Sequence, residues 1–128
     1  MNFIFLAIKE HSWGREMLSQ LLAAGFKPSL IIEEFSEGGE LERDKFEFRM
    51  GTHPMASTME SQAAKHDIPV VEVPIHNDEH CMEHIEKAEP ELIVFGGTRI
   101  IRGKILEYGE SRGGVLNSHP GLLPECRG

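Results

Sequence analysis

Apolar and polar positions divide the chain into short, evenly spaced segments. Phe3 to Ile8 is a continuous apolar run, which is typical of a strand buried on both faces of a sheet. Four later apolar runs each predict another strand: Pro28 to Ile32, Val70 to Val73, Leu92 to Phe95, and Val115 to Asn117.

The intervals between most of these runs show helical spacing and helix-end signals. Gly14 to Ala24 carries leucines at helical spacing, and Gly25 follows in a position that ends helices. A second predicted helix runs from a Ser57-x-x-Glu60 capping box to about His66. A third is capped by Asn77 or Asp78 and ends at Pro90. A fourth runs from Arg102 to Tyr108 and is stopped by Gly109. This alternation predicts an α/β fold, a Rossmann-like parallel sheet of about five strands with helical crossovers.

Residues 33–56 break the alternation because they show no helical period. Glu33 to Arg49 contains seven acidic and three basic residues. Phe46 to Met50 alternates with period two, as a short hairpin arm would. We expect a mobile, solvated loop over about 33–56, and the alternative is a lid over an active site.

Composition places the chain among ordinary globular proteins. Its 128 residues are 40% hydrophobic and 27% charged, and 13 basic against 21 acidic side chains give a net charge of −8. This charge argues against nonspecific binding to nucleic acid or to anionic membranes. Cys81 and Cys126 form no disulfide framework, and no segment has signal-peptide or membrane-spanning character. We therefore expect a cytoplasmic protein with no membrane partner.

The carboxyl ends of the strands are where ligands bind in an open parallel sheet. Lys9 to Gly14, after the first strand, contains no dinucleotide-binding or phosphate-binding glycine motif. His11 in this segment is either close to a substrate or an exposed loop residue. Gly96 and Gly97, after the fourth strand, allow a ligand to approach the backbone closely, although a plain turn also explains them.

Asn117 and His119 end the fifth strand two residues apart, so their side chains point to the same face. Pro120 favours an extended backbone at His119. An amide donor beside an imidazole suits the binding of an oxyanion and the transfer of a proton near neutral pH. Taken alone, the N-x-H-P pattern also fits a structural Asn and His.

Four possible metal ligands, His76, His80, Cys81 and His84, follow the third strand at the spacing of one helical stripe. Their acidic neighbours, and the expected position of His76 before the helix, favour a solvated helix face. We therefore predict no metal site.

The segment from Leu92 to Gly128 closely resembles the folate-dependent formyltransferase family. That family has a small-residue turn after a strand, then a helix, then a strand that runs into N-x-H-P-x-L-L-P and a later R-G. Here these motifs are Gly96-Gly97, Asn117 to Pro124, and Arg127-Gly128. The upstream order of strands matches more loosely, so the resemblance covers the whole chain.

The resemblance implies transfer of a formyl group from formyltetrahydrofolate, as co-substrate, to an amine through a tetrahedral intermediate. Asn117 and His119 match the family's catalytic Asn, which binds the developing oxyanion, and its catalytic His, which polarises the formyl oxygen and shuttles the amine proton. Positions of the pterin pocket match Gly97, Arg99, Ile100 and Ile101. The implied acceptor is a small-molecule amine, an aminoacyl group or an amino sugar.

Charge near the expected site differs from the charge of the whole chain. About half of the net −8 falls between Glu33 and Arg49, whereas Lys9, Arg99 and Arg127 are expected at the mouth of the site. The acidic composition is therefore compatible with an anionic folate or a phosphate-bearing acceptor.

Departures from the family pattern leave alternatives open. The family's third catalytic residue, an Asp further along the chain, has no counterpart in the nine residues after His119. The loop after the first strand also lacks the phosphate-binding run of the glycinamide ribonucleotide enzymes. Residues 1–128 are expected to be an incomplete, formyltransferase-like N-terminal domain, truncated at its C-terminus. The alternatives are a non-catalytic relative that binds folate or a partner, and a formyltetrahydrofolate hydrolase.

Overall fold

The computed structural model describes residues 1–118 of the chain as one parallel sheet with flanking helices. Its strands are β1 (Phe3–Ile8), β2 (Leu30–Glu34), β3 (Val70–Val73), β4 (Leu92–Phe95) and β5 (Val115–Asn117). They pair in the order β3-β2-β1-β4-β5, and every neighbouring pair is parallel. The predicted Rossmann-like α/β fold is therefore confirmed, with the apolar run of β1 at the centre of the sheet.

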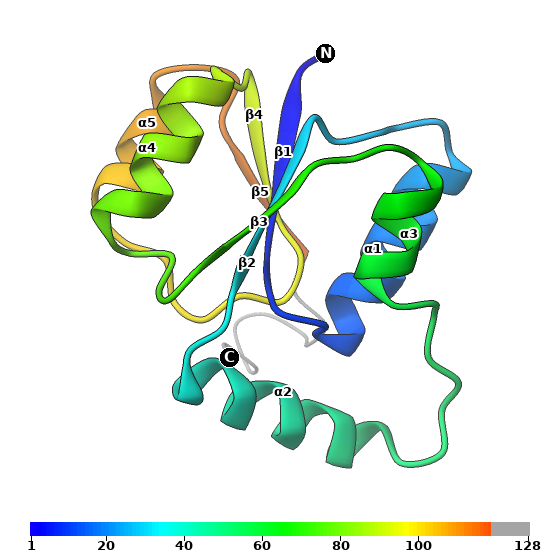
Figure 1. Ribbon diagram of the computed structural model, residues 1–128. Coiled ribbons are helices and arrows are strands. Elements are labelled where there is room, and N and C mark those ends of the chain that lie inside the picture. Colours follow the sequence, from blue (N-terminus) through cyan, green and yellow to red (C-terminus); the bar gives the residue numbers. More distant parts are fainter. Residues whose placement is uncertain (119–128) are drawn as a thin grey trace.

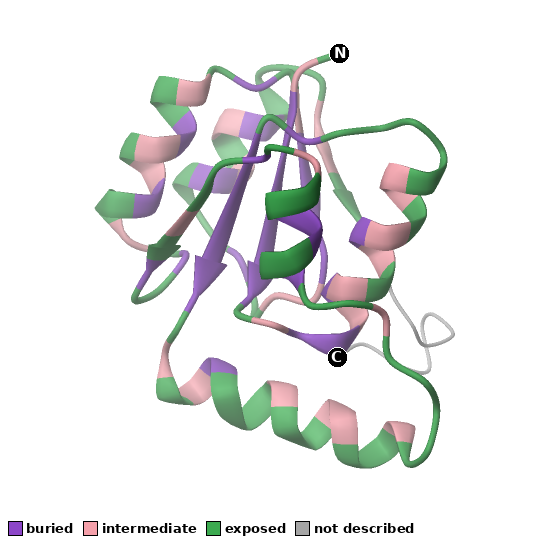
Figure 2. Ribbon diagram, turned by 45° about the vertical axis from the view of Figure 1, so that its right-hand side comes forward, coloured by how far each residue is buried: buried purple, intermediate pink, exposed green. Residues whose placement is uncertain are grey.

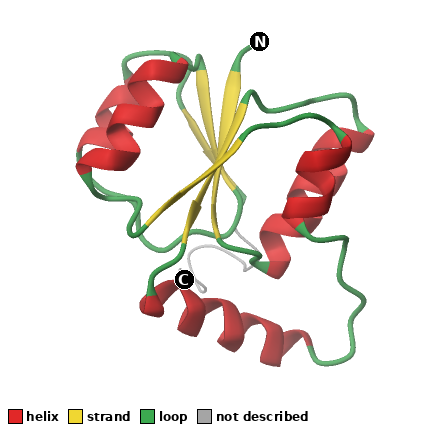
Figure 3. Cartoon of the chain, in the orientation of Figure 1, coloured by secondary structure: helices red, strands yellow, loops and turns green. Residues whose placement is uncertain are grey.

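Helices cover both faces of this sheet (Figures 1 and 3). α1 (Ser12–Ala23) and α3 (Met59–Lys65) lie on one face, and α4 (Glu79–Ala88) and α5 (Lys104–Glu110) lie on the other. Figure 2 shows β1 and β2 buried between these layers. Each face has its own apolar core, built for example from Phe5, Leu18 and Met59 on the first and from Leu6, Ile85 and Ile105 on the second. Within the described residues, no helix combines the length and the apolar character needed to cross a membrane.

The chain after β2 differs from the sequence prediction. β2 continues through Glu33 and Glu34, and a helix, α2 (Glu37–Met50), follows it and lies across the carboxyl ends of the strands (Figure 1). The predicted loop is therefore wrong over residues 33–34 and 37–50, and so is the predicted hairpin arm over 46–50, whereas residues 51–56 form neither helix nor strand. The hydroxyl of Ser36 caps α2 by accepting a hydrogen bond from the N–H of Gly39 (2.9 Å). Because most of α2 faces solvent, it needs no wide apolar stripe, and hydrophobic periodicity does not reveal it.

Helix ends agree with the sequence at some positions and differ at others. Gly25, with φ +88°, follows α1 as predicted, and Asp78 caps α4 as one of the two predicted residues. The cap of α3 is Thr58, not Ser57, so the predicted capping box is wrong by one residue. Gly109 lies inside α5, so the prediction that it ends this helix is wrong. A glycine is needed there for packing, because a Cβ would collide with the side chain of Val115.

Candidate active site

The carboxyl ends of β1, β4 and β5 lie next to one another at one edge of the sheet. β4 pairs with β1 on one side and with β5 on the other. The chain leaves β1 toward α1 on one face and leaves β4 toward α5 on the other face (Figure 3). In doubly wound sheets, ligands bind at such a switch in strand order. The fold therefore brings together the three strand ends that the sequence identified.

Gly96 and Gly97 hold the end of β4 close against β1. The N–H of Ile8 donates to the carbonyl of Gly97 (2.8 Å), which extends the pairing of β1 with this segment beyond the last residue of β4. A Cβ on Gly96 would collide with the ring of Phe5, and one on Gly97 would come within 2.5 Å of Nδ1 of His11. Gly97 also has a φ of +81°, which favours glycine. Both glycines are thus required by the turn itself, whichever ligand approaches it.

His11 lies directly after β1 and is buried, with 6% of its surface exposed. Its Nδ1 accepts a hydrogen bond from the N–H of Trp13 (3.1 Å), so His11 caps α1. Burial, helped by the positive charges of Arg43 and Arg49, lowers the pKa of His11 to about 4. The ring is therefore neutral near pH 7 and carries its proton on Nε2. The alternative of an exposed loop residue is therefore wrong: His11 is a buried cap at the end of β1, and it also packs against Phe46 of α2 (ring centroids 4.9 Å apart). Its closeness to a substrate stays a prediction.

The loop after β4 carries the residues predicted to bind the co-substrate. Ile100 is 71% exposed, whereas Ile101 is 8% exposed and belongs to the core beside α4 and α5. The side-chain amide of Asn77 binds the backbone of this loop through two hydrogen bonds. Its Nδ2 donates to the carbonyl of Ile100 (2.7 Å), and its Oδ1 accepts from the N–H of Arg102 (2.9 Å). The sequence offered Asn77 only as a possible helix cap.

Asn117 is the last residue of β5 and lies opposite Phe95 of β4. Its side chain is exposed at the carboxyl edge of the sheet, beside the glycine turn. His119 lies outside the described residues, as do Pro120 to Pro124 and Arg127. The convergence of Asn117 with His119 therefore stays a prediction.

A buried polar cluster that the sequence did not reveal lies beside this loop. Glu34, with 2% exposure, accepts hydrogen bonds from the hydroxyl of Ser36 (2.6 Å) and from the N–H of His76 (2.9 Å). The ring of His76 is fully buried, and its Nε2 donates to the carbonyl of Ile32 (2.9 Å). Its Nδ1 has no hydrogen-bond partner within the described residues and lies 3.7 Å from Oε1 of Glu34. Burial lowers the pKa of His76, and the nearby Glu34 opposes that effect. Acids that directly follow an apolar strand were the available signal for this cluster.

Positive charges at this edge are paired with acids. Lys9 forms an ion pair with Glu72 of β3, which raises the pKa of Lys9. Nη1 of Arg99 lies 3.8 Å from Oε2 of Glu34, and the Arg99 side chain remains 44% exposed. Lys9 and Arg99 are the two described residues among the basic side chains predicted at the mouth of the site, and acidic neighbours partly neutralise their charges.

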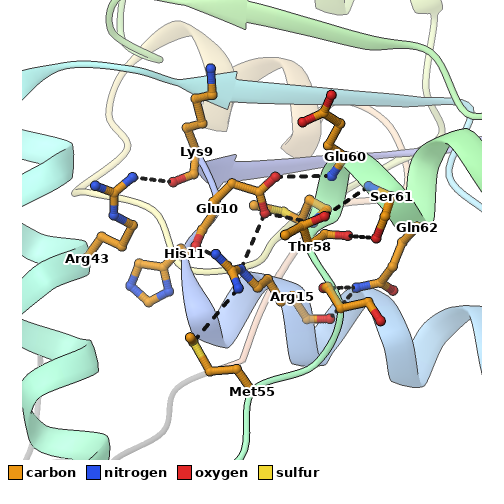
Figure 4. A network of polar contacts seen from close by, with 12 residues as sticks. Lys9, Glu10, His11, Arg15, Arg43, Met55, Thr58, Glu60, Ser61 and Gln62 are labelled. Atoms are coloured by element: carbon orange, nitrogen blue, oxygen red, sulfur yellow. Dashed lines mark hydrogen bonds and ion pairs between the residues drawn. The ribbon is translucent and has the colours of Figure 1, made fainter.

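A second polar network links the end of β1 to α3 (Figure 4). The carboxylate of Glu10 accepts hydrogen bonds from the N–H groups of Met59 (2.7 Å) and Glu60 (3.1 Å), and it also pairs with Arg15 (3.3 Å). The N–H of Glu10 in turn donates to the carboxylate of Glu33 (3.1 Å). This network fixes the backbone on the α1 and α3 side of the candidate site.

The four possible metal ligands do not converge on one site. His76 precedes α4 and is sealed against β2, Cys81 is a buried free thiol, and His80 is exposed. Burial raises the pKa of Cys81 to about 12, which keeps the thiol protonated. Across residues 1–118, no three His, Cys, Asp or Glu side chains are grouped to hold a metal ion.

Fold and strand-end loops define an open, doubly wound parallel α/β protein. Solved structures with this fold include the phosphoribosylglycinamide formyltransferase of Bacillus halodurans, with a TM-score of 0.63 and 19% identity over 97% of this chain and 58% of that one. The enzyme of the same name from Streptococcus pneumoniae TIGR4 gives a TM-score of 0.59 and 17% identity over 97% and 59%. At these identities the likeness shows the fold alone.

Relatives found by sequence are methionyl-tRNA formyltransferases. That of Halalkalibacterium halodurans is 40% identical over 70 residues, 52% of this chain and 21% of the relative. That of Chlorobium chlorochromatii is 36% identical over 73 residues, 57% and 23%. That of Thermotoga maritima is 26% identical over 129 aligned positions, 100% and 37%. The chain thus spans less than half the length of these relatives.

No family model matches the chain. The methionyl-tRNA formyltransferase relatives and the shared fold nevertheless agree with the strand-end motifs. These relatives support the resemblance to the folate-dependent formyltransferase family.

Proposed function

We propose that the full-length protein transfers a formyl group from formyltetrahydrofolate to an amine. The observation that carries this proposal is the position of Asn117, exposed at the end of β5 and beside the glycine turn that ends β4. This is the edge of a doubly wound sheet where ligands bind, and Asn117 matches the catalytic Asn of the family.

The reaction requires an amine to attack the formyl carbon that is bound to N10 of the folate. As the new C–N bond forms, the formyl oxygen takes up negative charge, and the Nδ2 donor of Asn117 hydrogen-bonds to that oxygen. His119 is assigned the polarisation of the same oxygen and the removal of the amine proton. The bond from the formyl carbon to N10 then breaks, and N10 takes up a proton, so that the amine is formylated and tetrahydrofolate leaves.

The folate is assigned to the loop after β4. Ile100 supplies an apolar surface for the pterin, and the backbone on either side of it supplies donors and acceptors for the polar edge of the pterin ring. Gly97 allows the ring to approach the backbone, and Arg99 supplies positive charge. Ile101 is largely covered by the core, so its contribution comes through its backbone.

An aminoacyl amine is the first acceptor to test, because the sequence relatives are named for methionyl-tRNA. Phosphoribosylglycinamide, from the names of the structural neighbours, and amino sugars complete the panel. The assay follows formylated product and free formate separately, so that release of formate without formylated acceptor identifies a hydrolase.

The test compares the full-length protein with Asn117→Ala, His119→Ala and a matched control, Leu116→Ala. Leu116 is 53% exposed on the same strand, so its truncation reproduces a change at the end of β5 without removing the proposed donor. Loss of one oxyanion donor should lower kcat by roughly 100-fold or more, whereas the control should retain its turnover. Near-wild-type turnover in both Asn117→Ala and His119→Ala would refute the proposal, and folate binding without turnover by the wild type would identify a non-catalytic binding module.

A further inference from the structure

The loop between β4 and α5 is held at its middle by one side chain from another part of the chain. Asn77 lies between β3 and α4, far from this loop in sequence, yet its amide bonds both to the carbonyl of Ile100 (2.7 Å) and to the N–H of Arg102 (2.9 Å). One donor and one acceptor directed at residues i and i+2 reproduce the pairing that a neighbouring strand would offer.

This pairing decides where the loop side chains point. The two bonds flank Ile101 and hold the local backbone in place, with the Ile101 side chain buried in the core at 8% exposure. The preceding residue, Ile100, is 71% exposed, so the two neighbouring side chains face opposite environments. The amide of Asn77 therefore fixes which hydrophobic side chain of the loop is presented outward.

Asn77 can act in this way because the residues on either side of it are themselves fixed. His76 is fully buried, its ring donates to the carbonyl of Ile32 in β2, and its N–H donates to the carboxylate of Glu34. Asp78 caps α4 by accepting from two backbone N–H groups, at 2.9 and 3.2 Å. A rigid connection thus runs from β2 through His76 to Asn77 and on to the loop.

We propose that Asn77 is a positioning residue for folate binding, which acts by holding the loop around Ile100 in the conformation that receives the pterin. The inference rests on the proposed function, because the loop is assigned to the folate there. Asn77 does not need to contact the ligand. Without its amide, the loop must become ordered when the folate binds. The affinity then falls in proportion to the fraction of time that the free loop spends in the binding conformation.

The test measures binding of 5-formyltetrahydrofolate, a stable isomer of the co-substrate, to the full-length protein by fluorescence titration. Asn77→Ala should raise the Kd by about five- to tenfold, the lower end of what two lost hydrogen bonds produce, because both bonds lie at the surface. Asn77→Asp keeps an acceptor for Arg102 but sets a carboxylate oxygen against the carbonyl of Ile100, so it should weaken binding at least as much. In turnover, KM for the folate should rise while kcat at saturating folate stays within a few-fold of wild type.

Asn2 provides a matched control at the opposite end of the sheet. Its Nδ2 also holds backbone, donating to the carbonyls of Ala88 (3.0 Å) and Glu89 (3.1 Å). Asn2→Ala should therefore cost comparable stability but leave the Kd for folate unchanged. Hydrogen exchange should become faster in residues 99–102 of Asn77→Ala and stay unchanged there in Asn2→Ala.

Wild-type affinity in Asn77→Ala, or an equal loss of affinity in Asn2→Ala, would overturn the positioning role while leaving the proposed function intact. If the wild type does not bind the folate, both proposals fail. The two failures are thus distinguished by the wild-type titration alone.

Discussion

Glu33 provides a quantitative test of how this fold treats a carboxyl group at a strand end. It lies on β2 with 3% of its surface exposed, and its carboxylate accepts a hydrogen bond from the N–H of Glu10 (3.1 Å). Burial raises its pKa to about 7, and the charges of Glu10 and Glu72 act in the same direction, against the opposing effects of the Glu10 N–H and of Lys9. Substitution by Gln removes the ionisation and keeps an oxygen that can accept from Glu10.

The expected size of the effect follows from the difference in pKa between the folded and unfolded chains. An ordinary carboxyl pKa of 4.5 against about 7 corresponds to about 3 kcal/mol. Because the folded state binds the proton more tightly, the free energy of unfolding falls as the pH rises from about 4.5 to about 7 and is level above that. Glu33→Gln should therefore be about 2–3 kcal/mol more stable than wild type at pH 8 and nearly equal to it at pH 4.

Urea unfolding of the purified protein at pH 4, 6 and 8 measures this difference directly. Glu86→Gln, an exposed change on α4, is the control and should shift the unfolding midpoint little at any pH. If the free energy of unfolding of Glu33→Gln did not exceed that of wild type at pH 8, or exceeded it by the same amount at every pH, the pKa of Glu33 would not be raised by burial.

Three further changes test the surroundings of the site. His11→Asn keeps an α1 cap but removes a ring whose pKa is lowered to about 4. That lowered pKa costs stability as the pH falls from about 6.5 to 4, so the variant should resist acid unfolding better than wild type. Circular dichroism measured against pH would detect the difference. Gly14→Ala sets a Cβ against the carbonyl of Gly96, so urea unfolding should show a loss of about 1–3 kcal/mol although Ala usually favours helices. Phe46→Ala removes the aromatic contacts of α2 with His11 and Trp13, and hydrogen exchange should become faster across α2 but not across β1. Unchanged profiles in these experiments would contradict the respective contacts.

Most of the fold follows from local sequence patterns. The β1 run and the later strands are apolar because both faces of the sheet are covered, and their carboxyl ends meet because the strands are parallel. Gly25 and Asp78 mark helix ends by their own backbone and side-chain chemistry, so the sequence indicates them directly. The position of the candidate site is predictable for the same reason, because its residues directly follow strands.

The rest depends on contacts between distant segments. α2 has few apolar residues because it covers strand ends instead of a sheet face, so its composition looks like that of a solvated loop. Asn77 resembles a helix cap in sequence, and only the return of the chain after β4 brings Ile100 and Arg102 to its amide. Such long-range hydrogen bonds have no periodic signature.

Two of the acids that contribute to the net negative charge, at the end of β2, are buried instead of solvated. Sequence patterning treats a run such as Glu33-Glu34 as solvated, but both residues are buried, and Glu34 receives two hydrogen bonds and faces Arg99. A separation of 3.8 Å with a side chain that is 44% exposed makes the Glu34–Arg99 pair weak, so Arg99 remains available to an anion. The exposed part of the Arg99 side chain therefore supplies positive charge at this edge, even though the net charge of the chain is −8.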